Sequence, residues 1–186
     1  MENSLSSSIL TSTGKWFDIL TPNPSFIDLR DIASALSKLC RFGGHCKQFY
    51  SVAEHSLLVA KMMRQRNRNS SILIRWALLH DASEAYVVDI PRPAKRQLSE
   101  YMKIEDKIQR TIAERYGLPW PMPHEVHEAD SNILSLELRA YMLEQPEHML
   151  PPLPTIGLAD GLPAKTLSPR MAERAFLKEA KALEIV

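Results

Sequence analysis

The stretch ILIRWALLHDASEAY, residues 72–86, is a long apolar run that contains no proline and no glycine. Leu73, Trp76 and Ala77 recur at three- and four-residue spacing and share one stripe with His80. This spacing predicts a helix over residues 72–86 with the stripe turned toward the core. His80 is therefore expected to point inward, and Asp81 follows it directly, at an irregular helical turn.

Helical spacing recurs on both sides of this stretch. Apolar residues at the same intervals predict helices over residues 31–39, from residue 52 into the Arg/Asn-rich stretch that follows, and over 100–116, 125–143 and 170–184. Residues 64–69 are expected to form a solvated turn. Pro91 and Pro93 are expected to end regular structure after Asp89 and to leave a loop or a short new helix. The expected fold class is therefore all-α.

Two segments lack this spacing. Residues 1–30 are expected to form an irregular N-terminal arm, with residues 16–24 either irregular or a short strand pair packed on the body. Residues 146–169 hold six of the 13 prolines and predict an extended connection that wraps the body before the last helix. A chain of 186 residues suits one domain with a substantial core, so a single domain over residues 1–186 is expected.

The composition is that of a globular protein, with 45% hydrophobic and 24% charged residues. A net charge of +1 gives no electrostatic reason to expect a nucleic acid polymer as partner. Residues 1–13 lack the basic start and apolar run of a signal peptide, and no stretch has membrane-spanning length, so cytoplasmic residence without a membrane partner is expected. Cys40 and Cys46 are expected to be small buried thiols.

Four ionisable side chains lie where burial is expected, and burying an unpaired charge is costly. His55 and His80 lie on apolar stripes, Asp130 shares a face with Val126 and Ile133, and Asp81 follows His80. Taken singly, each could be a hydrogen-bonded core residue or half of a buried ion pair. Together, two imidazoles and two carboxylates suit one divalent metal ion, which would satisfy all four.

Longer motifs surround these residues. They are YSVAEHS at residues 50–56, LLHDASEAYVVDIPRPAKR at 78–96 and HEADSNIL at 127–134. With them the chain resembles the HD-domain phosphohydrolases over roughly residues 16–143, and in particular bacterial and prophage 5′-nucleotidase-like members and small phage dATP triphosphohydrolases. The resemblance implies an all-α HD-domain bundle with the metal between helices, and His55, His80, Asp81 and Asp130 as its ligands.

The remaining acidic residues of the motif suggest the catalytic groups. Glu84 follows His80 by four residues and Asp81 by three, so on a helix it rises from the same face and suits a general base; the alternative is a surface glutamate. Asp89 could reach a second metal ion, a leaving oxygen or a sugar hydroxyl. The expected cofactor is a divalent ion (Zn, Co, Mn or Mg), with a possible second divalent ion near Glu84 and Asp89.

Substrate contacts are expected from the CRFGGH loop, residues 40–45, and from the prolines. Arg41 resembles the family's phosphate-binding arginine, and Phe42 and Pro93 resemble its two base-facing residues; ordinary loop packing is the alternative. Arg92 and Lys95 add positive charge or are merely solvated. Gly44 keeps the loop open. The other histidines are expected to be structural or exposed, with His127 the closest rival ligand.

The resulting hypothesis is a hydrolase of 2′-deoxynucleotides in nucleotide-pool control, which removes phosphate from a monophosphate or polyphosphate from a triphosphate. Three cations near the site favour more than one phosphate. The open loop predicts that purines are accepted with at most a modest preference for adenine. The expected partners are a small nucleotide and further copies of the chain in a homo-oligomer. One alternative is a catalytically silent nucleotide-binding HD module. Another is a cyclic-dinucleotide phosphodiesterase, which is less favoured because the additional signature of those HD proteins is not found in the sequence.

Overall fold

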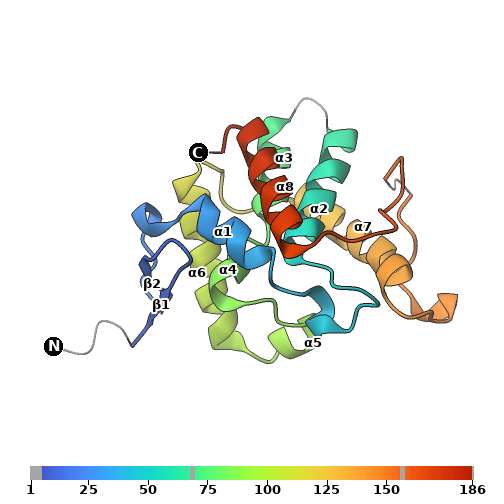
Figure 1. Ribbon diagram of the computed structural model, residues 1–186, viewed down its shortest axis with the longest axis horizontal. Coiled ribbons are helices and arrows are strands. Elements are labelled where there is room, and N and C mark those ends of the chain that lie inside the picture. The colour runs from blue at the N-terminus through green and yellow to red at the C-terminus, as the bar shows by residue number, and fades with distance from the viewer. Residues whose placement is uncertain (1–5, 68–69, 156–157, 186) are drawn as a thin grey trace.

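The computed structural model describes residues 6–67, 70–155 and 158–185, and within them the chain is mostly helical (Figure 1). This confirms the expected all-α class. Its α-helices are α1 (Leu29–Leu36), α2 (Val52–Arg66), α3 (Ser71–Leu79), α4 (Glu84–Val87), α5 (Arg92–Lys95), α6 (Ser99–Arg115), α7 (His124–Tyr141) and α8 (Pro169–Ala182). Short 3₁₀ helices lie at Pro24–Phe26, Arg41–Gly44 and Glu147–Met149. None of the helices described could cross a membrane.

Helix α2 lies at the centre of the bundle, in contact with α3, α7 and α8. It begins with a capping box, in which Ser51 and Glu54 satisfy each other's backbone amides. Because neighbours cover it on several sides, most of its first twelve residues are buried, among them Val52, Val59 and Met62. The helix continues through Arg66, past the start of the turn predicted at residue 64. Residues 68–69 of that turn lie outside the described part of the chain.

The helix predicted over residues 72–86 is in fact two helices, α3 and α4, separated by a turn at residues 80–83. The buried side chain of Gln109, from α6, fastens this turn on both sides. Its Nε2 donates to the Leu79 carbonyl at 2.7 Å, and its Oε1 accepts from the Ser83 amide at 2.9 Å. The side chain thus satisfies backbone groups that the interruption would otherwise leave unpaired in the core.

Of the two alternatives for the N-terminal arm, the structure has the short strand pair, although the pair begins at residue 8, before the predicted segment 16–24. Strands β1 (Ser8–Leu10) and β2 (Trp16–Asp18) form an antiparallel hairpin, with Ile9 opposite Phe17. Asp31 of α1 holds the hairpin turn, accepting bonds from the Ser12 hydroxyl at 2.7 Å and from the Thr13 amide at 2.7 Å. The hairpin lies at one end of the molecule and the proline-rich connection near the other (Figure 1).

The later elements follow the predictions closely. Helix α6 ends in a Schellman arrangement at Gly117, whose φ of +62° suits glycine, with the Leu118 amide bonded to the Ala113 carbonyl. The described part of residues 146–168 holds no regular element apart from one 3₁₀ turn, and α8 begins at Pro169, the last residue of the predicted connection. Ser168 is the N-cap of α8, where its backbone carbonyl, and not its side chain, accepts the first helical bonds. Cys40 and Cys46 are free and only partly buried, contrary to expectation.

Candidate metal centre

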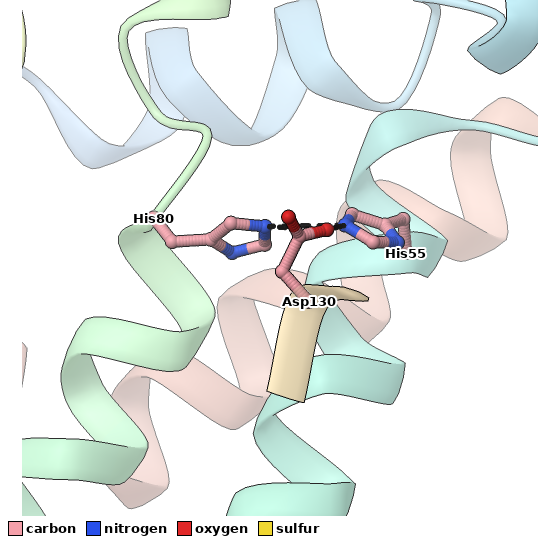
Figure 2. A group of neighbouring side chains, drawn as sticks. All are labelled: His55, His80 and Asp130. Atoms are coloured by element: carbon pink, nitrogen blue, oxygen red, sulfur yellow. Dashed lines mark hydrogen bonds and ion pairs between the residues drawn. The ribbon is translucent and has the colours of Figure 1, made fainter. Parts of the chain in front are cut away.

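Three side chains from three helices bring ligand atoms to one point (Figure 2). His55 comes from α2, His80 from the end of α3 and Asp130 from α7. The Nε2 atom of His55 lies 3.1 Å from Nε2 of His80 and 3.1 Å from Oδ1 of Asp130. All three ligand atoms lie within 4.8 Å of one another, so the group could hold a metal ion. Both histidines are buried, as their apolar stripes predicted.

The hydrogen bonds on the far side of each ring decide which nitrogen is free. Nδ1 of His80 donates to the Ala77 carbonyl at 2.8 Å, since a carbonyl can only accept. Nδ1 of His55 lies 2.6 Å from Oε1 of Glu137. Burial alone would raise the pKa of Glu137, but the charges of His55 and Arg41 lower it to about 2, so this carboxylate also accepts. When both rings are neutral, both Nε2 atoms are therefore bare of hydrogen. Burial and the charge of Arg41 would lower the pKa of His55, but Glu137 and Asp130 raise it to about 9, so without a metal ion Nε2 of His55 carries a proton that a bound cation would replace.

Two bare ring nitrogens that face each other at 3.1 Å present their lone pairs to one another, which is repulsive unless a proton or a cation lies between them. A carboxylate oxygen beside them completes a nitrogen and oxygen donor set that divalent transition metals prefer. Donation of the other ring nitrogen to a carbonyl or a carboxylate is also the usual arrangement of histidine ligands. The residues present therefore fit a metal ion.

Asp81, expected as the fourth ligand, lies beside this group. Its Oδ2 is 3.1 Å from Nε2 of His80 and 3.5 Å from Nε2 of His55. It stands outside the set of atoms that lie within 4.8 Å of one another, and Nη1 of Arg41 is 3.6 Å from the same oxygen. No second group of three ligands forms in the described residues, so Glu84 and Asp89 do not build one with a third residue.

The second oxygen of Asp130 has a partner of its own. Nη2 of Arg92, on α5, donates to Oδ2 at 2.6 Å, while Oδ1 faces the histidines. Burial would raise the pKa of Asp130, yet its bond with His55 and the charges of the two histidines lower it to about 2. Asp130 is therefore ionised and turns Oδ1 toward the candidate centre.

A cavity of about 800 Å³ opens beside the centre and is lined by His80, Asp81 and Asp130. Of the residues predicted to bind substrate or to act in catalysis, all but Gly44 also line this cavity. They are Arg41, Phe42, Glu84, Asp89, Arg92, Pro93 and Lys95. Gly44 does not line the cavity, and a side chain at its position would meet nothing within 4 Å. An isolated antiparallel β-bridge between the backbones of Cys40 and Ser51 closes the loop that carries Arg41 and Phe42.

Glu84 is 4% exposed and lines the cavity, and its Oε2 has no hydrogen-bond partner. Burial raises its pKa well above the ordinary value, and the charges of Asp81 and Asp89 raise it further. Burial likewise raises the pKa of Asp89. Two carboxyl groups with raised pKa values thus share the cavity, and such groups suit proton transfer near neutral pH.

Each cation on the cavity wall already pairs with a carboxylate. Arg41 is buried and contacts Oε2 of Glu137 at 3.1 Å and Oδ2 of Asp81 at 3.6 Å. Lys95 contacts Glu105 at 2.5 Å, and Arg92 holds Asp130 as described. The expectation that three cations favour a substrate with several phosphates was based on the number of cations alone, without the carboxylates that pair with them. Pairing removes that basis, because a compensated cation attracts a phosphate less than a free one.

Sequence reasoning missed two buried residues of the centre. Glu137 is fully buried and joins His55, Arg41 and Tyr50. A signal existed, because Glu137 follows Asp130 by seven residues, two helical turns, and so lies on the same face of α7. Gln109, which fastens the turn after His80, left no such signal. The apolar wall formed by Trp120, Met122 and Leu138 also went unpredicted.

Comparison with known proteins places the chain among relatives. No protein-family model matches it. It is 44% identical to the uncharacterized protein YfdR of Escherichia coli K12 over 131 residues, 70% of each chain. The chain belongs to the YfdR family. The chain is also 36% identical to an uncharacterized protein of Rhodobacter capsulatus over 123 residues. These residues cover 63% of the chain and 62% of that protein. Neither name states an activity, so the chemistry must be inferred from the site.

Proposed function

We propose that this member of the YfdR family is a metal-dependent phosphohydrolase of the HD type that acts on 2′-deoxynucleotides. The observation that carries the proposal is the pair of Nε2 atoms of His55 and His80, 3.1 Å apart, on rings whose Nδ1 atoms both face acceptors, in a ligand group whose Asp130 borders a cavity of nucleotide size. The motifs around these residues, which resemble those of HD-domain phosphohydrolases, support the choice of reaction.

His55, His80 and Asp130 would hold the ion, with Asp81 as the fourth ligand. Imidazole nitrogen favours Zn or Co, and the carboxylates also admit Mn or Mg. When bound, such an ion lowers the pKa of a coordinated water and polarises a phosphoryl oxygen. The bonds of the two Nδ1 atoms fix the rings, so that little reorganisation is needed when the substrate arrives.

Glu84 is the proposed general base. Its free Oε2 faces no competing donor, and its raised pKa places proton uptake nearer to neutral pH than for an exposed glutamate. In this role Oε2 takes the proton of the attacking water as the new bond to phosphorus forms. Asp89, whose pKa is also raised, is proposed to give a proton to the departing sugar oxygen.

The cavity wall suggests the substrate. Phe42, Pro93 and Trp120 offer apolar surface for a base, since ring faces stack on bases without strong selectivity. Six acidic side chains line the cavity against three cations, and each of those cations is paired. Because added negative charge is disfavoured there, we expect monophosphates to be hydrolysed in preference to triphosphates.

The test combines metal analysis with product analysis. Purified protein is stripped with a chelator, reloaded singly with Zn, Co, Mn or Mg, and incubated with each deoxy- and ribonucleotide as mono- and triphosphate. We expect orthophosphate from deoxynucleoside monophosphates with at least one metal, and none from the stripped protein. Binding of nucleotide without any product would instead support a silent nucleotide-binding module. Product formation that does not depend on the metal would overturn the proposal.

A further inference from the structure

Glu137 is a fully buried carboxylate that contacts both His55 of the candidate metal centre and Arg41 of the cavity wall. Its Oε1 lies 2.6 Å from Nδ1 of His55 and accepts from the Tyr50 hydroxyl, also at 2.6 Å. Its Oε2 accepts from Nη2 of Arg41 at 3.1 Å. The residue is 0% exposed, so these donors satisfy it in place of water.

The backbone explains why this carboxylate reaches His55. Seven residues separate Asp130 from Glu137, which on a helix is about 10.5 Å along the axis and nearly two full turns. Helix α7 packs against α2, so the same face of α7 presents Asp130 to Nε2 of His55 and Glu137 to Nδ1 of the same ring. The imidazole is thereby held from both sides by one helix.

We infer that Glu137 is a positioning residue, which keeps the proton of His55 on Nδ1 and so leaves Nε2 free to bind the metal ion. This inference rests on the metal centre of the proposed function. A histidine ligand without such a partner can exchange its tautomer and rotate, and loss of the partner typically weakens metal binding about 10- to 100-fold. Arg41 and Tyr50 hold the carboxylate itself in place.

Glutamine at this position is expected to fail in either orientation of its amide. With its oxygen toward His55 and Tyr50, its NH₂ group would face Nη2 of Arg41, donor against donor. With its NH₂ group toward His55, Nδ1 would have to accept, and the proton would move to Nε2, where the metal is expected. Glu137→Gln therefore disturbs the centre although it changes the volume of the side chain little.

The experiment measures metal affinity and tautomer separately. Stripped wild type and Glu137→Gln are titrated with Zn²⁺ and Co²⁺ in competition with a chromogenic chelator. We expect the variant to bind both ions about 10- to 100-fold more weakly. In the zinc-loaded wild type, long-range ¹H–¹⁵N spectra should show a proton on Nδ1 of His55 and none on Nε2.

Glu54→Gln is the matched control, because it makes the same substitution at a buried glutamate one residue before His55. The carboxylate of Glu54 accepts from the Leu167 amide at 2.6 Å and from the Ser51 amide at 3.3 Å, and it bonds neither ring of the centre, so metal affinity should stay at the wild-type value. Equal affinities of wild type and Glu137→Gln would overturn the inference and leave the proposed function standing. If the variant does not fold, the wild-type spectrum alone decides, since a zinc-loaded His55 without a proton on Nδ1 overturns it. No binding of any divalent ion by wild type would overturn both proposals.

Discussion

Replacing Glu84 with glutamine should make the metal-free protein more stable and the loaded protein less active. The carboxyl group is 4% exposed, one of its oxygens has no partner, and burial raises its pKa well above the ordinary value of 4.5. Below pH 4.5 the group is neutral in both the folded and the unfolded chain. As the pH rises from there toward the raised pKa of the folded state, the unfolded chain gives up its proton first, so stability is lost.

The size of the effect follows from the unpaired oxygen. A buried polar group without a partner costs about 1 to 3 kcal/mol, and an amide would still be incompletely paired, so we expect a gain of about 1 to 2 kcal/mol at pH 7.5. For a chain of this length, melting temperature rises by about 2 to 4 °C per kcal/mol, which gives about 2 to 8 °C. Calorimetry of both proteins in the presence of a chelator at pH 4.5 and 7.5 measures this difference in melting temperature. The difference should be smaller at pH 4.5.

The hydrolytic activity of the metal-loaded Glu84→Gln protein should fall. Loss of the general base is expected to lower turnover about 10²- to 10⁴-fold while metal content stays unchanged. Glu100→Gln, at an exposed position of α6, is the control and should change neither property. A Glu84→Gln protein that is less stable than wild type at pH 7.5, or that hydrolyses nucleotides at the wild-type rate, would refute the assignment.

Three further outcomes are expected. His80→Ala and Asp81→Ala should each lose metal and activity together, and full metal occupancy by mass spectrometry in either variant would contradict its place in the centre. Chelation should lower the melting temperature, because an ion at 100 times its Kd adds about 2.7 kcal/mol to stability; an unchanged melting curve would count against a buried site. Phe42→Ala should weaken every nucleotide by a similar factor, up to about 1 to 3 kcal/mol for a stacked base, and unchanged Michaelis constants would exclude stacking.

Helical spacing predicted the fold and the inward histidines well, because both depend on local sequence. His55 and His80 lie on stripes that are buried as expected, and α6 and α7 begin and end within two residues of their predicted bounds. An irregular turn was expected at Asp81, but the complete end of α3 at Leu79 could not be predicted in this way. It depends on Gln109, thirty residues further along, whose amide reaches the turn only after the helices have packed.

Charge pairing was hidden from the sequence for a similar reason. Arg41 and Glu137 are 96 residues apart in the chain, and nothing near either residue reveals the other. The cations that the sequence suggested were available for phosphate, Arg41, Arg92 and Lys95, are therefore each paired with a carboxylate in the folded protein. Grouping Asp130 with Glu137 by their seven-residue spacing was possible, since both lie on one face of α7, but which ring nitrogen they address depends on how α7 packs against α2.

The turn fastened by Gln109 bears on any attempt to graft this centre onto a designed scaffold. Neighbouring residues on a straight helix point about 100° apart, so a His-Asp pair copied onto one would send its two side chains in different directions. Here His80 and Asp81 come within 3.1 Å of each other at the interruption that Gln109 stabilises. A designer would have to transplant the interruption and its amide clamp together with the ligands, and could score candidate scaffolds on whether a second helix can deliver that amide.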